Sequence, residues 1–518
     1  MHSSSTVEVP SVRELSSIAA NNTPDKVAFG EGVDGPTVTW KDFDEQSIQA
    51  ANAFGDSVGL GDRVVFLCEN SIEHTTLWNG ALKAGCVVSN LHVRAAPNTI
   101  AHCIDACKPR ALVVDESTTE LFEDRVADKL STTLDVVVNT GAAQTRRQQS
   151  FETFVDGHST TPPDVRTMED DTAAIMWTSG TTGEPKGWCF TNRALYLRAS
   201  TLVDVLEVNR TTRQPHVFTP SFAAWYSVML PALLTGATTY FLDTWDPGEY
   251  LQMIETHGLT TALLVPTMWR EILNMGSFDE YDLDSLQAIT SAGEVLDATT
   301  LERLRENVCE VVKNSYAATE AYSTVMNNAE LEAGRIDSVG KPVPGVQIRI
   351  VDPGGTYEDV RDVGEVGEIA VRAPDAPVWA WGRTEKTEQS FEDGWWYSGD
   401  LGYRDEDDFI YLEGRSDFQI MSKGIKVYPT PIEERLNAHP DVEESAVVGV
   451  EDDEYGEKVT AYVYAPDSDV SADALDEWCL ASDDLARMER PRSYHFVEDP
   501  LPRTATGKLD RMSAKADE

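Results

Sequence analysis

Residues 177–187 form a dense run of hydroxyl residues and glycines, in the order Trp-Thr-Ser-Gly-Thr-Thr-Gly-Glu-Pro-Lys-Gly. Such residues cannot pack a core, but their backbone N–H groups and hydroxyls can bind a phosphate. The glycines permit close approach and positive φ, and the lysine adds a cationic charge. Because Lys186 is followed by Gly187, the run differs from the GxxxxGK[ST] loop of kinases and GTPases. A flexible polar loop is the alternative. The expected phosphate-binding residues are Thr178, Ser179, Gly180, Thr181, Thr182, Gly183 and Lys186.

The segments around this run alternate between helical and strand patterns. Amphipathic stretches at 41–54 and 73–84 flank the apolar run 63–68, and a second apolar run follows at 111–114. This order predicts βαβ units. Further short apolar runs predict buried, largely parallel strands at 136–138, 239–242, 262–266 and 288–290. We therefore expect an α/β protein whose large N-terminal domain packs helices against mostly parallel sheets.

The pattern changes twice towards the C-terminus. Glycine and proline punctuate alternating segments at 347–351 and 367–372, which predicts a β-rich subdomain over about 337–413. A helix is expected at 431–437, with Thr430 as N-cap, Pro431 at the first helical position and Glu433 at the third. Strands at 446–450, 459–464 and 494–497 and a helix near 472–480 complete this part. The predicted division is an N-terminal domain at 1–413, a connection at 414–417 and a small α+β domain at 418–518.

The charge of the chain excludes several classes of partner. The 518 residues include 88 acidic and 42 basic side chains, giving a net charge of −46 and a pI of about 4.4. Such a field repels nucleic acids and anionic lipid surfaces, so only a small nucleotide held by local groups fits. At molar ionic strength the Debye length falls to about 3 Å, and dense carboxylates then keep a protein hydrated without strong mutual repulsion. We expect adaptation to high salt, with an ordinary acidic enzyme as the alternative.

The cysteines and the apolar runs indicate the cellular compartment in which the protein works. The seven cysteines include no CxxC pair, which disfavours a disulfide framework or a zinc ribbon. Cys103 and Cys107 lie one helical turn apart beside His102, but no second ligand pair follows, so buried helical thiols are expected rather than a metal site. Residues 1–20 lack the features of a signal peptide, and no apolar run reaches 18 residues. These features predict a cytoplasmic protein without a transmembrane segment, and a homodimer is compatible with them.

The run at 177–187 resembles the signature loop of the adenylate-forming (AMP-binding) superfamily, which includes acyl-CoA synthetases, luciferases and the adenylation domains of peptide synthetases. The resemblance continues in order along nearly the whole chain. The other matching segments are Ser291-Ala-Gly-Glu294, Tyr316-Ala-Ala-Thr-Glu320, Gly340-Lys-Pro342, 364–368, Tyr397-Ser-Gly-Asp400, Gly414-Arg-Ser-Asp417, Ser422-Lys-Gly424 and Pro502-Arg-Thr-Ala-Thr-Gly-Lys508.

The resemblance assigns nucleotide-binding roles to the matched residues in the middle of the chain. Gly293, Glu294 and Tyr316 are expected beside adenine, because a tyrosine offers a flat face and a glycine lets the base approach the backbone. Thr319 is expected to donate to an α-phosphate oxygen, and Glu320 to supply a hard oxygen ligand for Mg²⁺. Read alone, each segment is also typical of a surface turn or a strand end.

Later residues are implied to contact the ribose and the thiol. Asp400 is expected to accept hydrogen bonds from the ribose diol, with Arg415 as a second contact if a hairpin brings it near; alone, each is typical of a solvated charge. Asp417 matches the pivot of a mobile C-terminal domain, although a lone Asp in such a loop is usually a turn residue. The segment implied to line the CoA path is Ser422, Lys423 and Gly424.

Lys508 lies in a Gly-Thr loop near the C-terminus, which by itself is weak evidence for a role. The resemblance implies that this lysine reaches into the main domain. There it would stabilise the charge on the substrate carboxylate and the α-phosphate during adenylation.

The segment 220–225 matches the acyl-binding region of the family. Peptide-synthetase relatives hold the substrate amino group with an aspartate at the position of Ala223, so an apolar monocarboxylic acid is expected here. Many synthetases have histidine at Ala223 and near Asn192, and glycine at Ala317, so these departures leave both the substrate range and the level of activity open. The expected acyl-pocket residues are Phe222, Ala223, Trp225 and Ala317.

Together the motifs predict an AMP-forming acyl-CoA synthetase that adenylates a fatty or aryl acid with ATP and Mg²⁺. Free CoA is the expected acceptor, because the chain ends soon after Lys508 without a carrier domain. Two alternatives remain. One is a free-standing enzyme that loads a carrier protein, and the other is a catalytically silent nucleotide-binding protein.

Overall fold

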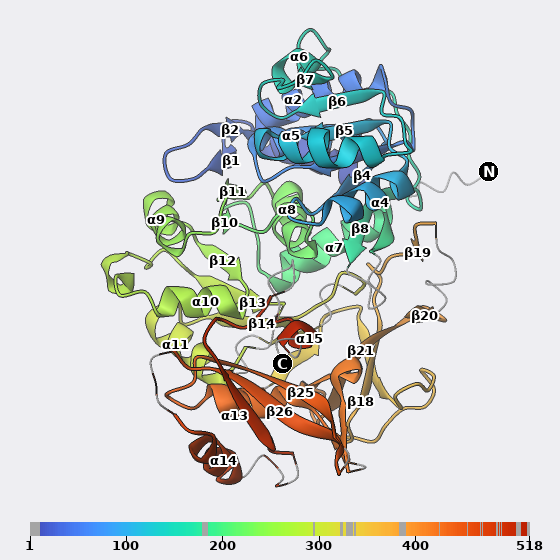
Figure 1. The fold of residues 1–518 in the computed structure, drawn as a ribbon. Helices are drawn as coiled ribbons and strands as arrows, with labels where there is room; N and C mark the ends of the chain where they lie inside the picture. The colour runs from blue at the N-terminus through green and yellow to red at the C-terminus, as the bar shows by residue number, and fades with distance from the viewer. Residues whose placement is uncertain are drawn as a thin grey trace, which may run out of the picture.

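The computed structural model describes residues 11–178, 185–293, 296–321, 325–327, 335, 338–382, 390–423, 425–452, 454–466, 468, 470–482, 485, 487, 489–503 and 509–514. These residues form an α/β fold with four sheets, which confirms the predicted fold class. In Figure 1 the N-terminal elements, in blue and cyan, lie at the top and the C-terminal elements, in orange and red, at the bottom.

The first sheet carries both ends of the predicted phosphate-binding loop. Six of its strands pair in parallel, whereas the strand that begins at Lys186 pairs antiparallel with its neighbours on both sides. The strands, in spatial order, are β19 (Trp379–Ala380), β9 (Lys186–Thr191), β8 (Thr172–Thr178), β4 (Val87–Asn90), β3 (Arg63–Leu67), β5 (Ala111–Val114), β6 (Val136–Asn139) and β7 (Gln148–Ser150).

Helices cover both faces of this sheet. Val64 and Phe66 of β3 face one core cluster, while Val65 and Leu67 face the other, because successive side chains of a strand point to opposite faces. This explains why the run 63–67 is apolar throughout. The first cluster includes α1 (Leu15–Asn22), α2 (Trp40–Gly55), α3 (Ile72–Lys83), α7 (Asn192–Val205) and α8 (Ala223–Thr235), and the second includes α4 (Pro97–Cys107). The short helix α5 (Glu116–Glu120) lies between β5 and β6 in the sequence, and the short helix α6 (Phe151–Val155) follows β7.

Side-chain caps begin the two helices that were expected in this part of the chain. The Thr39 side chain accepts a hydrogen bond from the backbone N–H of Asp42 at the start of α2. The Ser71 side chain does the same for His74 at the start of α3. Both caps satisfy amide groups that have no partner within the helix.

Two further sheets follow. A small sheet has the order β10 (Arg213–His216), β11 (Thr238–Phe241), β1 (Val27–Glu31) and β2 (Thr37–Thr39). The larger one has the order β12 (Thr261–Leu264), β13 (Ala288–Ala292), β14 (Val312–Tyr316), β15 (Val325–Asn327), β16 (Ser338–Pro342), β22 (Ile410–Arg415), β21 (Trp395–Arg404), β18 (Gly367–Arg372) and β17 (Gln347–Val351), with β20 (Phe391–Glu392) beside β21. Its helices are α9 (Pro247–His257), α10 (Pro266–Leu273) and α11 (Ala298–Asn307), which pack in one core cluster with β12 and β13.

One expected strand is shorter than predicted. The strand expected at 262–266 ends at Leu264, because Pro266 begins α10 and the chain turns into that helix. Proline suits the first helical position, since its missing N–H would have no partner there.

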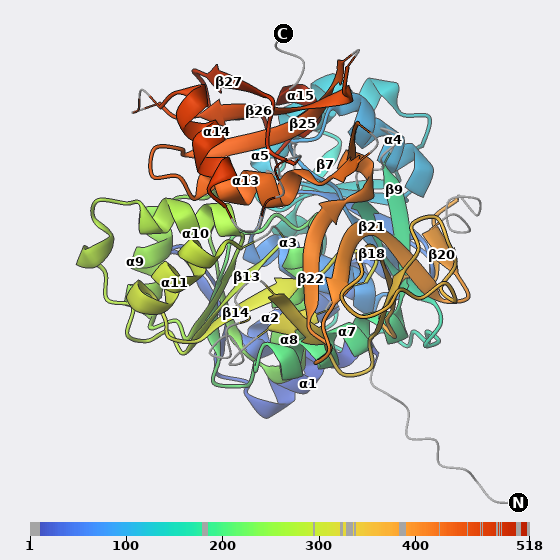
Figure 2. The same ribbon diagram turned by 90° about the horizontal axis from the view of Figure 1, so that it is seen from below.

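The C-terminal sheet has the order β24 (Ile425–Val427), β23 (Ile420–Ser422), β26 (Gly456–Tyr464) and β25 (Glu444–Asp452), with β27 (Ser493–Val497) parallel to β26. Its helices are α13 (Pro429–Asn437), α14 (Ala472–Leu480) and α15 (Arg511–Ala514). Figure 2 shows α13 beside the orange strands β21 and β22, and α13 contacts β22.

Helix α13 corrects the prediction made for its start. It begins at Pro429, two residues early, and its N-cap Tyr428 makes no side-chain cap. Glu433 is therefore not a capping residue. Its carboxylate is buried and accepts two hydrogen bonds from Arg511, at 2.8 and 2.6 Å.

The cysteines agree with the expectation of buried helical thiols. All seven cysteines are buried and free, and Cys103 and Cys107 lie on α4. Among the described residues, no helix combines the length and the hydrophobicity needed to cross a lipid bilayer.

Candidate functional site

The hairpin of β8 and β9 positions the two described ends of the predicted phosphate-binding loop. Thr178 pairs with Lys186 in antiparallel register, so the two side chains stand at the base of the loop. The residues between them that were predicted to bind phosphate, Ser179, Gly180, Thr181, Thr182 and Gly183, lie outside the described residues.

Glu320 lies against this hairpin. The indole N–H of Trp188 donates to Glu320 Oε1 at 2.7 Å and lies 3.2 Å from Thr178 Oγ1, which is itself 3.4 Å from Glu320 Oε1. Burial raises the pKa of the Glu320 carboxyl group, while the hydrogen bond from Trp188 and the charge of Lys186 oppose that rise. The structure therefore joins the base of the loop to the segment that follows β14, and Thr319 precedes Glu320 in that segment.

Sequence reasoning missed Trp188. The available signal was an aromatic residue two positions after Lys186, which puts both side chains on the same face of β9. Because Trp188 is fully buried, its N–H needs an acceptor, and Glu320 supplies it.

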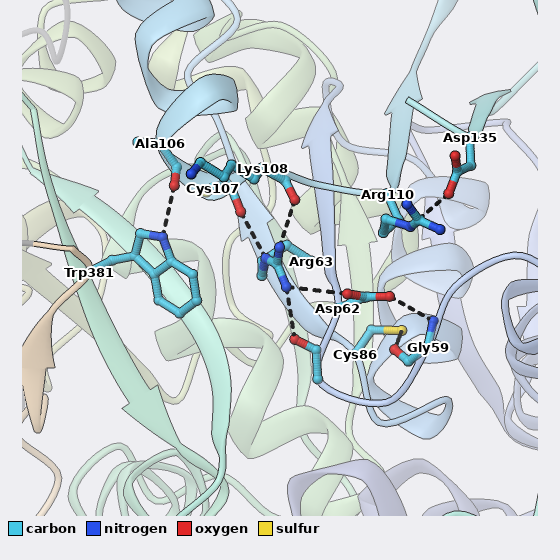
Figure 3. A network of polar contacts seen from close by, with 11 residues as sticks. Gly59, Asp62, Arg63, Cys86, Ala106, Cys107, Lys108, Arg110, Asp135 and Trp381 are labelled. Atoms are coloured by element: carbon cyan, nitrogen blue, oxygen red, sulfur yellow. Dashed lines mark hydrogen bonds and ion pairs between the residues drawn. The ribbon is translucent and has the colours of Figure 1, made fainter. Parts of the chain in front are cut away.

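A second tryptophan holds the outer side of β9. The backbone N–H of Trp381 donates to Gly187 O at 2.7 Å, and its indole N–H donates to Ala106 O at 2.9 Å, at the end of α4 (Figure 3). The Arg63 guanidinium lies 5.8 Å from the Trp381 ring centroid and donates to the carbonyls of Cys107 and Lys108 at 2.8 and 2.7 Å. These donors satisfy carbonyls that the end of a helix leaves free. The strand carrying Lys186 is thus held from both sides.

Gly293 and Tyr316 lie at the ends of adjacent parallel strands. Ala292 of β13 pairs with Ser315 of β14, so the residues that follow them are neighbours. Gly293 has a φ of 93°, and a Cβ there would meet nothing closer than 3.5 Å. Glycine is therefore favoured here by the backbone conformation and not by a lack of space for a side chain. Glu294 lies outside the described residues.

The structure brings Asp400 and Arg415 together in the way the ribose prediction required. The two residues pair across the hairpin of β21 and β22, and Arg415 Nη1 donates to Asp400 Oδ1 at 2.9 Å. The Tyr316 hydroxyl donates to Asp400 Oδ2 at 2.6 Å, and burial together with the Asp400 charge raises the pKa of Tyr316. Since each carboxylate oxygen has two lone pairs, Asp400 retains acceptor positions for a ligand.

Replacing Asp400 by asparagine is expected to raise the KM for ATP about 10-fold, because the variant loses charge-assisted acceptors worth about 1.4 kcal/mol. The measurement is the initial rate of pyrophosphate release against ATP concentration. Asp408→Asn is the control, since Asp408 pairs with Arg404 at the opposite end of the same hairpin. Equal ATP KM values in the two variants would contradict a role for Asp400 in nucleotide binding.

The predicted acyl-binding residues divide into two groups. Phe222, Ala223 and Ala317 are partly exposed, and the Phe222 ring lies 5.1 Å from His92, edge to face. Trp225 lies instead in the core: it is fully buried against Trp78 and Tyr226, and its indole N–H donates to Asn70 Oδ1 at 2.9 Å. This side chain therefore packs in the core, and its assignment to the acyl pocket stays a prediction.

The residues expected to line the CoA path lie in the C-terminal part of the chain, as do Asp417 and Lys508. Ser422 is buried, whereas Lys423 has a φ of 49° and pairs with Glu454 at 2.6 Å over the Tyr455 ring. The backbone of Asp417 lies in the 3₁₀ turn η6 (Ser416–Phe418). Gly424 and Lys508 lie outside the described residues.

Three comparisons with known proteins identify the family of this chain. The family model described as AMP-binding enzyme matches residues 17–376, and the model described as AMP-binding enzyme C-terminal domain matches residues 431–508. A 3-hydroxybenzoate–CoA/4-hydroxybenzoate–CoA ligase of Thauera aromatica is 30% identical over 486 residues, covering 92% of this chain and 91% of the relative.

The names of two other similar proteins add a carrier protein as acyl acceptor and anthranilate as substrate acid. The fatty acid–[acyl-carrier-protein] ligase ScoC of Streptomyces coeruleorubidus is 29% identical, covering 93% of this chain and 92% of the relative. The crystal structure of the anthranilate CoA ligase AuaEII in complex with anthranoyl-AMP superposes with a TM-score of 0.89 at 25% identity, covering 100% of this chain and 98% of that one. Since the first family model alone spans more than half of the sequence, the chain belongs to the AMP-binding enzyme family.

Proposed function

We propose that this protein is an AMP-forming acyl-CoA ligase that acts on an apolar monocarboxylic acid, aryl or fatty. The observation that carries the proposal is the contact of Trp188 with both Thr178 and Glu320. This contact supports a single nucleotide site formed by the base of the hydroxyl-rich loop, Lys186 and the segment after Tyr316. Similarity to CoA ligases over more than nine-tenths of the chain supports the same activity.

The chemistry of this reaction has two steps. A carboxylate is a poor acyl donor, because its leaving group would be oxide. In the first step a carboxylate oxygen attacks the α-phosphorus of ATP, and pyrophosphate leaves as acyl-AMP forms. In the second step the CoA thiol displaces AMP and forms the thioester. The protein contributes mainly positioning and charge neutralisation.

Described residues fit the nucleotide and its metal ion. Asp400 and Arg415 suit the ribose hydroxyls, Tyr316 with Gly293 suits the base, and Lys186 suits the outgoing phosphates. Mg²⁺ is commonly held by one or two carboxylates together with substrate phosphates. A single carboxylate, Glu320, therefore fits it, and no cluster of three or more metal-ligating side chains is found among the described residues. When bound, the ion would neutralise phosphate charge.

The acid class follows from the acyl-binding segment. Ala223 offers no charge for a substrate ammonium group, and Phe222 with His92 provides an aromatic surface beside it. A buried unpaired charge on the substrate would be costly there. The hydroxybenzoate and anthranilate specificities in the names of two relatives support an aryl acid.

We also propose that the protein works in a salt-rich cytoplasm. The net charge of −46 supports high salt, because screening removes most of the repulsion between surface carboxylates. Seven free, buried cysteines support a reducing compartment.

The proposal is tested by screening aryl and fatty acids for pyrophosphate release in molar KCl, with and without CoA. We expect release that depends on the acid, and thioester formation when CoA is present. Nucleotide binding without acid-dependent release from any acid would instead indicate a catalytically silent protein.

A carrier-protein ligase is the second candidate, favoured by the similarity to ScoC. It predicts that acyl-AMP accumulates in the presence of free CoA and is consumed only by a phosphopantetheinyl carrier. Consumption of acyl-AMP by free CoA at a comparable or higher rate would exclude this function.

A further inference from the structure

Arg198 is an arginine of α7 that is wholly shielded from solvent. Its Nε donates to Asp375 Oδ2 at 3.0 Å, and the side chains of the two residues are 0% and 3% exposed. The guanidinium carbon lies 4.5 Å from the Phe190 ring centroid, and Nη1 donates to Met176 Sδ at 3.7 Å. A charge buried in this way is costly unless it is paired, so Asp375 explains why the arginine is tolerated.

The ion pair with Asp375 does not account for all of the hydrogen bonds that the Arg198 guanidinium donates. Arg198 Nη2 also donates to the backbone carbonyl of Thr319 at 3.2 Å, across 121 residues of sequence. Thr319 immediately precedes Glu320. One rigid side chain therefore contacts β8 through Met176, β9 through Phe190 and the segment that carries the candidate metal ligand.

We propose that Arg198 is a positioning residue for Glu320. By holding the Thr319 carbonyl it keeps the Glu320 carboxylate at Trp188 and Thr178, where it can meet Mg²⁺ and the phosphates of ATP. Arg198 itself touches neither substrate nor metal. This inference rests on the proposed adenylation activity and adds a residue that no sequence motif marked.

The rival explanation is an ion pair that only stabilises the core. The two explanations predict different results when Arg198 is replaced by lysine. A lysine carries the same charge and can pair with Asp375, but its single ammonium group cannot reproduce the planar fork that spans Asp375 and Thr319. If positioning matters, Arg198→Lys loses function while it remains folded.

The test compares ATP affinity in Mg²⁺ and in EDTA by titration calorimetry, for the wild type and Arg198→Lys. We expect Mg²⁺ to strengthen ATP binding to the wild type, and that gain to fall about 10-fold in the variant, while affinity in EDTA stays within about twofold. Acid-dependent pyrophosphate release should fall about 10- to 100-fold in kcat at saturating ATP, because small misplacements at a reacting centre are costly.

Two further variants keep the test decisive. Arg303→Lys is the matched control, since Arg303 of α11 also bridges a backbone carbonyl, at Leu273, and a side-chain oxygen, at Asn274, and it lies outside the candidate site. It should retain the Mg²⁺ gain and the rate. If Arg198→Lys does not fold, the double variant Arg198→Met with Asp375→Leu removes both charges without leaving one buried, and it should show the same loss of the Mg²⁺ gain.

An unchanged Mg²⁺ gain in a folded Arg198 variant would overturn the inference. A wild type that binds Mg²⁺ and ATP but releases no pyrophosphate with any acid would overturn the proposed function alone, because the affinity comparison still decides the role of Arg198. A wild type that does not bind ATP would overturn both.

Discussion

Replacing Lys508 by alanine is expected to lower the rate of acyl-AMP formation at least 100- to 1,000-fold. Removing one preorganised group that stabilises developing transition-state charge typically costs a factor of about 10² to 10³. The attack of CoA on preformed acyl-AMP should remain largely intact, because we propose that the lysine acts in the first step only and is withdrawn before the second. The measurements are pyrophosphate release for the first step and thioester formation from synthetic acyl-AMP for the second.

Lys515→Ala provides the control, since Lys515 is the other lysine in the last residues of the chain. It should leave both steps unchanged. An equal loss of both steps in Lys508→Ala would contradict the role in adenylation and would point instead to a general effect on the C-terminal part. The result bears directly on the proposed mobile domain at 418–518 and its pivot at Asp417.

Replacing Glu320 by glutamine is expected to lower kcat for pyrophosphate release about 100-fold. The amide retains an oxygen that can accept from Trp188 Nε1, so local packing should persist. It lacks the negative charge that suits Mg²⁺. Glu302→Gln, an exposed position on α11, is the control and should keep the wild-type rate. A Glu320→Gln variant with wild-type kcat and an unchanged Mg²⁺ requirement would exclude the carboxylate as a metal ligand.

The same substitution has an opposite effect on stability. Burial raises the pKa of Glu320 in the folded protein, so the carboxyl group loses its proton more readily when the chain unfolds. Its charge therefore costs stability at pH values above both pKa values, and this cost disappears as pH falls through the folded and then the unfolded value of about 4.3. Glu320→Gln should be more stable than the wild type at pH 7, and the difference should shrink towards pH 4. Denaturant titrations at both pH values measure it.

Local patterns in the sequence predicted many elements of the fold. The strands at 111–114, 347–351 and 367–372 and the helix at 472–480 lie where their apolar periodicity placed them. Periodicity works at these positions because a strand or helix that buries one or both faces records that burial in neighbouring residues. The hydroxyl-rich run marked Thr178 and Lys186 as candidates. The resemblance to the family's motifs marked Tyr316, Glu320, Asp400 and Arg415 as candidates for binding the nucleotide and its metal ion.

Only the tertiary structure decided which of these residues meet. Glu433 shows the difference: its spacing suggested a helix cap, yet its carboxylate binds Arg511, 78 residues away. Trp188 and Glu320 meet across 132 residues, and Arg198 and Thr319 across 121. A cap or an alternating strand depends on residues a few positions apart, so one sequence displays it. A contact between distant residues depends on strand order and register, which are set by the packing of the whole core and leave no local trace in the chain.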